Sequence, residues 1–103
     1  MKLIEKLSDM IEDEIDGAEC YAKMAVKYKE ERPELANLMY ALSGEELGHM
    51  QKLHNMVVRI IEEYRKDKGE PPASMMAIYE YLHNKQIDEA REVKDLQALY
   101  RGE

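Results

Sequence analysis

A long helix is indicated by residues 33–66, PELANLMYALSGEELGHMQKLHNMVVRIIEEYRK. Pro33 suits the first turn of a helix, where the N–H that proline lacks has no partner anyway. Apolar residues then recur every three or four positions, which is the helical period, and they form two neighbouring strips. The first strip contains Leu35, Leu38, Met39, Leu42, Leu53, Met56, Val57, Ile60 and Tyr64; the second contains Tyr40, Leu47, His54, Val58 and Ile61. This helix therefore has two apolar faces to cover.

The residues on both sides of this stretch also follow the helical period, without the alternation that is typical of strands. Only Pro33 and the segment 68–72 interrupt the pattern. We predict an all-α protein with one domain, residues 1–103, and helices at about 2–30, 33–66 and 73–100. A short link makes the first two helices antiparallel neighbours. The third helix can cover one strip of the second, so the other strip is expected to meet a second copy of the chain.

One carboxylate lies in the middle of the apolar stripe expected on residues 2–30. This stripe comprises Leu3, Leu7, Met10, Glu14, Ala18, Tyr21, Ala25 and Tyr28, and Ile4, Ile11 and Ala22 widen it on one side. Glu46 and His49 interrupt the first strip of residues 33–66 in the same way, and their spacing places them on one helix face. Removing water from charged groups costs several kcal/mol, so a cation is expected beside them. Because carboxylates and imidazoles are ligands of divalent metals, the sequence predicts a metal site at Glu14, Glu46 and His49.

Simpler interpretations of these residues stay open. A Glu-x-x-His pair also arises by chance in a chain with 22 acidic residues and 3 histidines, as an ion pair on a solvated face. Tyr21 lies two turns from Glu14 on the same face, where its hydroxyl could hydrogen-bond a ligating carboxylate or simply belong to the core. For a second pair, Glu80-x-x-His83, the favoured interpretation is a core histidine and a solvated glutamate. For His54, the favoured interpretation is a structural role, in which a carbonyl or a carboxylate is its partner.

The composition restricts the function further. The net charge of −7 argues against a nucleic-acid partner, because a phosphate backbone requires a basic surface. No apolar run is long enough to span a bilayer and no leader-like segment is recognisable, so no membrane association and a cytoplasmic location are expected. The single cysteine, Cys20, cannot form an internal disulfide or a four-cysteine metal site.

Glu14, Tyr21 and the later Glu46-x-x-His49 together resemble the first helix pair of ferritins, bacterioferritins and rubrerythrins. The pattern of such proteins is a Glu from each of two helices and a Glu-x-x-His from each of the other two. The chain is also similar in size and layout to encapsulated ferritins, in which two copies complete the site. The resemblance covers about residues 3–66. It implies a ferritin-like antiparallel helical hairpin with a third, C-terminal helix, whose four-helix bundle is completed by dimerisation.

A dinuclear iron site is what this resemblance implies. Two chains would contribute two copies each of Glu14, Glu46 and His49, which is a full ligand set for two iron ions per dimer; Zn, Ca or Mn could substitute. The implied activity is that of a ferroxidase or of a peroxide- or O2-reducing oxidoreductase, with these three residues as catalytic metal ligands and Tyr21 ordering the carboxylates. Without a four-cysteine domain, a peroxidase would need an external electron donor. The alternative is a non-enzymatic helical assembly module with an empty or structural metal site.

Overall fold

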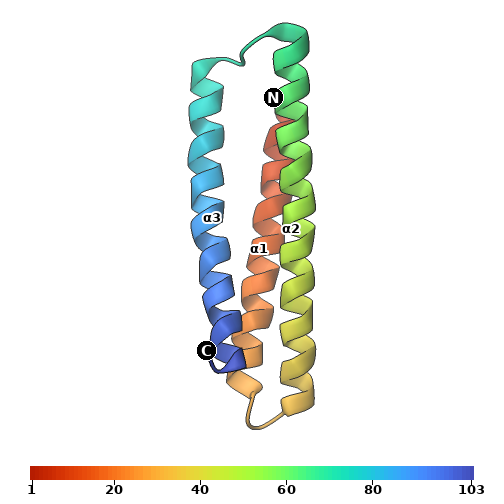
Figure 1. The fold of residues 1–103 in the computed structure, drawn as a ribbon, viewed down its shortest axis with the longest axis vertical. Coiled ribbons are helices and arrows are strands. Elements are labelled where there is room, and N and C mark those ends of the chain that lie inside the picture. Colours follow the sequence, from red (N-terminus) through yellow and green to blue (C-terminus); the bar gives the residue numbers. More distant parts are fainter.

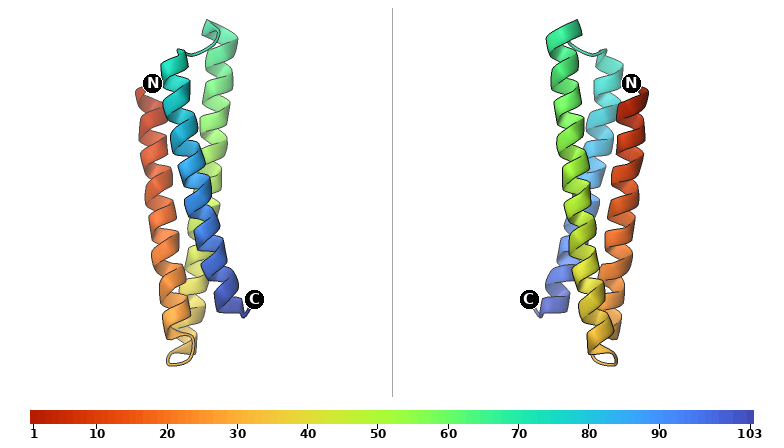
Figure 2. Two further views of the ribbon diagram at one scale, coloured as in Figure 1. Left: turned by 90° about the vertical axis from the view of Figure 1, so that its left-hand side faces the viewer. Right: turned by 90° about the vertical axis from the view of Figure 1, so that its right-hand side faces the viewer.

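Three α-helices joined by two short links make up the computed structural model, which describes all residues, 1–103 (Figure 1). Helix α1 spans Lys2–Tyr28, α2 spans Pro33–Lys68 and α3 spans Ala73–Arg101. The first two helices form an antiparallel hairpin, and α3 returns alongside α1 in a rod of 55 × 19 × 17 Å. Figure 2 shows from two sides that all three helices follow the long axis of the rod. The prediction of an all-α fold is confirmed, and no helix combines the length and the apolar content that crossing a bilayer requires.

Glycines stop two of the helices. Gly69 has a φ of +82°, and its N–H donates a hydrogen bond to the Arg65 carbonyl at the end of α2. Gly102 has a φ of +85° at the end of α3, in the left-handed region. A side chain would strain the backbone at such angles, which explains why glycine occupies both positions. Pro72 then precedes the first residue of α3.

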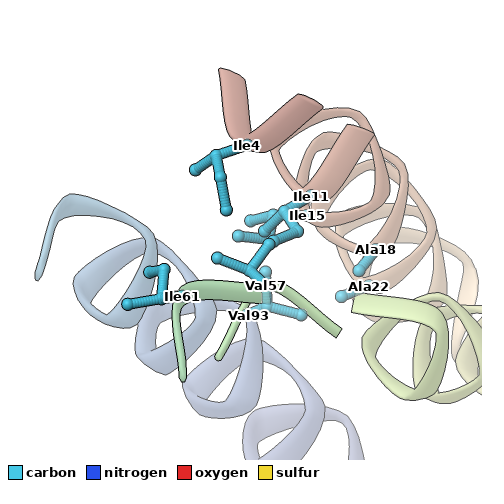
Figure 3. Packing of buried hydrophobic residues seen from close by; sticks show 8 residues of the cluster. All are labelled: Ile4, Ile11, Ile15, Ala18, Ala22, Val57, Ile61 and Val93. Atoms are coloured by element: carbon cyan, nitrogen blue, oxygen red, sulfur yellow. The ribbon is translucent and has the colours of Figure 1, made fainter. Parts of the chain in front are cut away.

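The core lies where α1 faces both of the other helices (Figure 3). Its eight buried residues are Ile4, Ile11, Ile15, Ala18 and Ala22 of α1, Val57 and Ile61 of α2, and Val93 of α3. The cluster thus combines small alanines of α1 with larger isoleucine and valine side chains from all three helices. Fully burying an Ile or Val side chain contributes about 1.5–3 kcal/mol. This core therefore fixes the face that α1 presents to α3.

The buried face of α1 differs from the stripe expected from the sequence. Leu3 and Met10 were expected inside but are 53% and 41% exposed, whereas Ile15, which the pattern did not single out, is fully buried. The reason is that α3 packs on the flank that carries Ile4 and Ile11, which turns the stripe containing Glu14 toward the open side of the hairpin. Only the packing of α3 selects between the two apolar flanks of α1.

The expected division of α2 into a covered strip and an uncovered strip is confirmed in part. In the second strip, the Tyr40 ring stacks on Tyr100 with centroids 4.7 Å apart, and Ile61 is buried. The first strip stays partly open, because Leu38 and Met56 are 52% and 44% exposed. Two residues depart from this division, because Val57 of the first strip belongs to the buried core and Val58 of the second strip is 38% exposed. One apolar face of the α1–α2 hairpin is thus left without a partner in the single chain.

Buried polar contacts hold α3 in register. The Gln86 side-chain amide donates to the Ser8 carbonyl at 3.2 Å and to the Ser8 hydroxyl at 3.1 Å. Near the other end of α3, the Gln97 amide donates to the Ser43 hydroxyl at 2.9 Å, and that hydroxyl donates to the Ala18 carbonyl at 2.8 Å. Leaving such a buried group without a partner costs about 1–3 kcal/mol, so both contacts oppose any sliding of α3.

Candidate metal centre

Helices α1 and α2 bring together the three residues that the sequence proposes as metal ligands. Glu14, Glu46 and His49 each offer one ligand atom, and these atoms lie within 4.8 Å of one another. The His49 Nδ1 atom is 3.4 Å from Glu14 Oε2 and 3.8 Å from Glu46 Oε1. The helical period alone places Glu46 and His49 on one face, and the hairpin brings Glu14 opposite them.

One oxygen of this cluster has no partner. Glu14 Oε2 is buried and accepts no hydrogen bond, and it is the one buried side-chain polar atom in the chain in that condition. Buried polar groups are normally hydrogen-bonded, and an exception calls for a specific explanation. A cation at this position would supply the missing partner. The donor set fits as well, because two carboxylates and an imidazole suit iron, zinc and manganese.

The charge of the two carboxylates is poorly compensated within the chain. Hydrogen bonding with the Glu14 side chain, burial and repulsion by the Glu14 charge raise the pKa of Glu46, and the nearby His49 opposes this only in part. Two close carboxyl groups cannot both ionise freely, so without a cation Glu46 gives up its proton less readily. A divalent ion would favour the ionised form of both groups, and metal binding should therefore release protons.

A glycine makes room for the Glu46 side chain. A Cβ atom at Gly17 would lie 3.4 Å from Glu46 Oε2, at the near limit of ordinary contact. Gly44 and Gly48 serve no comparable purpose, because a Cβ at either position would meet nothing within 4 Å. The space beside Glu46 is thus specific to Gly17, and it lets the carboxylate lie against α1.

The cluster opens toward the uncovered face of the hairpin. The side chains of Glu14 and Glu46 are 26% and 25% exposed, and that of His49 is 54% exposed. Met10 and Met56, which share this face by helical period, are also exposed. The three candidate ligands are therefore surrounded by protein on one side only, and an ion bound there would keep open coordination positions.

Tyr21 is half-buried, and its hydroxyl makes no hydrogen bond to Glu14 or Glu46 in the single chain. Its expected role in ordering the carboxylates stays a prediction. The second Glu-x-x-His pair lies elsewhere, with Glu80 exposed and His83 half-buried. No group of three candidate ligands includes either residue.

A second acidic cluster, which the sequence did not predict, is formed by Glu12, Asp16 and Glu89 between α1 and α3. Lys85 neutralises part of it, with its Nζ atom 3.0 Å from Glu12 Oε1 and 2.7 Å from Glu89 Oε1. Burial raises the pKa of Glu12, and the hydrogen bonds to both glutamates raise the pKa of Lys85. Only the docking of α3 brings these residues together, so no local pattern could have revealed the cluster. Its lysine makes it an ion-pair network between helices.

An all-helical chain with a Glu on one helix and a Glu-x-x-His on the next has the fold and the residue pattern of the ferritin-like diiron superfamily. Within this superfamily the chain belongs to the rubrerythrin family, whose family model, "Rubrerythrin", matches residues 5–101. The match extends through α3, beyond the part that carried the resemblance in the sequence. A rubrerythrin-type domain implies iron binding in the family. Comparisons with curated proteins and with solved structures give no match.

Proposed function

We propose that two copies of this chain hold a pair of iron ions between them and use it for ferroxidase or peroxide- or O2-reducing chemistry. The observation that carries the proposal is Glu14 Oε2, a buried acceptor without a partner that lies beside Glu46 and His49. The membership in the rubrerythrin family supports iron as the metal.

The ligand count supports a shared site. One chain offers two carboxylates and one imidazole, whereas the full pattern of the superfamily has four carboxylates and two imidazoles. A twofold axis through the open face of the hairpin would bring a second Glu14, Glu46 and His49 opposite the first set. The same contact would cover the apolar side chains that the single chain leaves exposed, Leu38 and Met56 among them. Burying them supplies a driving force for association.

The chain's own residues would have three tasks at such a site. Glu14 and Glu46 would bind through carboxylate oxygens, and His49 would bind through an imidazole nitrogen. The apolar neighbours on the open face exclude water once a second copy covers them. When bound, an iron pair supplies the two electrons that reduce O2 or a peroxide as Fe(II) becomes Fe(III). Cys20 is the only cysteine and is exposed, so electrons for repeated turnover would come from an external donor.

The test is anaerobic titration of the metal-free protein with Fe(II), followed by exposure to air. We expect about one iron per chain, a mass in solution of at least a dimer and a ferric absorption after oxidation. Glu19→Ala is a suitable control, because Glu19 pairs with Lys23 on the surface at 2.6 Å and is not part of the cluster. A chain that stays monomeric and binds no iron would refute the proposal. Stoichiometric zinc with no oxidation chemistry would instead favour a structural metal site.

A further inference from the structure

The seam between α2 and α3 is open, because α3 packs mainly on α1. A groove of about 400 Å³ follows this seam, and its lining includes Met50, His54, His83 and Gln86. A smaller groove of about 240 Å³ follows the same two helices, lined by Val58, Ile61, Glu62, Arg65, Met76, Tyr79 and Glu80. Two of the three histidines of the chain thus meet in a hollow that solvent can enter.

The two imidazoles lie face to face across this seam. The His54 ring of α2 and the His83 ring of α3 have centroids 4.6 Å apart and planes only 10° from parallel. Tyr79 stacks on His83 with centroids 5.8 Å apart. Neither histidine makes a hydrogen bond to another residue, so the carbonyl or carboxylate partner expected for His54 is absent and a stacked ring takes its place. The ring nitrogens are therefore free to bind a ligand that enters the groove.

The His54 ring is in a form that suits a metal. Burial and the neighbouring His83 lower the pKa of His54, so its ring is neutral at neutral pH. A neutral imidazole is the form that ligates metals. The torsion about the Cβ–Cγ bond of histidine is soft, so a modest rotation can turn one nitrogen of each ring toward a common point between the helices.

A third donor comes from the Glu-x-x-His pair of α3. Glu80 precedes His83 by one helical turn, lines the smaller groove between α2 and α3 and makes no ion pair. Its side chain is exposed and makes no hydrogen bond or ion pair that would prevent it from rotating toward His83. Two imidazoles and one carboxylate, with water in the remaining position, form a ligand set that zinc accepts.

We propose that His54, His83 and Glu80 bind one divalent ion of the zinc or copper class, which clamps α3 to α2. This site is independent of the iron site. His54 follows His49 by five residues, which turns the helix by about 140°, so the two histidines face different sides of α2. Each site can therefore be lost without the other.

The surrounding charges permit a cation at this position. Glu62 and Glu80 line the smaller groove, although Arg65 lies there too and pairs with Glu70 at 3.2 Å. Arg91 and Lys94 line the far end of the larger groove. They follow His83 by eight and eleven residues, about 12 and 16 Å along the helix axis, where salt screens most of their charge.

The experiment is a Zn²⁺ titration of His49→Gln protein, labelled with ¹⁵N in its histidine rings. Only His54 and His83 then contribute ring signals. We expect both rings to shift in one saturable step at about one Zn²⁺ per chain, each through one coordinated nitrogen. Rings that do not shift, or a single ring that shifts alone, would overturn the proposal. Because His49 is exposed and outside this seam, its substitution leaves the proposed ligands unchanged.

Variants of the ligands complete the test. His54→Gln and His83→Gln should each eliminate binding of this ion. Glu80→Gln should weaken Zn²⁺ binding at least about tenfold, because even residues that only orient a metal ligand typically contribute that much. Glu63→Gln, which alters an exposed residue of α2 outside both grooves, is the matched control and should bind as before. Unchanged affinity in Glu80→Gln would refute the three-ligand assignment. If His54→Gln does not fold, His54→Phe keeps a stacked ring and serves the same purpose.

Discussion

The chain contains the Glu-x-x-His spacing twice, on α2 and on α3, and the two copies have different surroundings. Glu46 and His49 face a third ligand, Glu14, and lie on the uncovered side of the hairpin. Glu80 and His83 face α2, where His54 stacks on the second histidine at 4.6 Å. One pair therefore meets a carboxylate with an orphaned oxygen, and the other meets a neutral imidazole.

The difference shows that the residue on the opposing helix determines what such a pair can bind. Two carboxylates with one imidazole are a hard, strongly anionic set, whereas two imidazoles with one carboxylate form a less charged set that zinc accepts. The spacing within one helix ensures only that both side chains share a face.

The largest effect should come from removing the ligands of the first pair. Glu14→Ala, Glu46→Ala and His49→Ala should each abolish stoichiometric iron binding, because each removes two ligands from a symmetric pair of chains. Glu80→Ala should bind iron as wild type does. The measurement is iron per chain after desalting. If Glu80→Ala or His83→Ala lost iron while Glu14→Ala retained it, the roles of the two pairs would be reversed.

Iron should also stabilise the folded protein. At a free concentration of a hundred times Kd, binding adds about 2.7 kcal/mol to the free energy of unfolding. For a domain of this size that is a rise in Tm of roughly 10 °C or more. Thermal unfolding with and without Fe(II) measures the shift, which Glu14→Ala should eliminate. The metal-free Glu14→Ala protein should be no less stable than wild type, since the substitution removes a buried acceptor that had no partner. An equal shift in both proteins would place the ion elsewhere.

Gly17→Ala should raise the stability of the protein and at the same time weaken iron binding at Glu46 and His49. Alanine stabilises a helix interior by about 1 kcal/mol relative to glycine. The new methyl group, however, would stand 3.4 Å from Glu46 Oε2 and restrict that carboxylate. We expect a more stable protein, by urea unfolding, with weaker iron binding. Gly44→Ala offers the same helical gain with nothing within 4 Å, so its iron affinity should not change.

The smallest effect should be on how the stability of the metal-free protein changes with pH. The contributions of His54 and Glu46 to stability should depend on pH with opposite sign. The pKa of His54 is lowered from 6.5, so its contribution to stability is complete above that pH and is lost as the pH falls toward the folded-state pKa. The pKa of Glu46 is raised from 4.5, so its contribution is complete below that pH and is lost as the pH rises through the folded-state pKa.

Urea unfolding between pH 4 and pH 8 distinguishes the two contributions. His54→Phe should flatten the acid loss of stability near pH 6, and Glu46→Gln should remove the gain at lower pH, each relative to wild type. Curves that keep the same shape in both variants would show that neither group titrates as described.

The sequence was sufficient for features that repeat along one helix. Pro33 and the segment 68–72 gave the limits of the helices to within about two residues, and the helical period placed Glu46 beside His49. It was insufficient to predict which of the two apolar flanks of α1 is buried. The sequence could not show that Ile15 rather than Met10 lies inside, because the docking of α3 makes that choice. The His54–His83 stack and the Glu12–Lys85 ion pair join residues 29 and 73 positions apart, and no local pattern encodes such contacts.

The two glutamine contacts of α3 have a consequence for how this protein can change. Gln86 and Gln97 are eleven residues apart, close to three helical turns, and both reach into the interior. A shift of α3 by one turn, about 5.4 Å, would detach both amides at once. The position of α3 is thus determined by contacts of its own side chains and not by the length of its connection to α2. Extra residues at Gly69–Glu70 should be tolerated, and this bend is the natural entry point for an inserted peptide or tag.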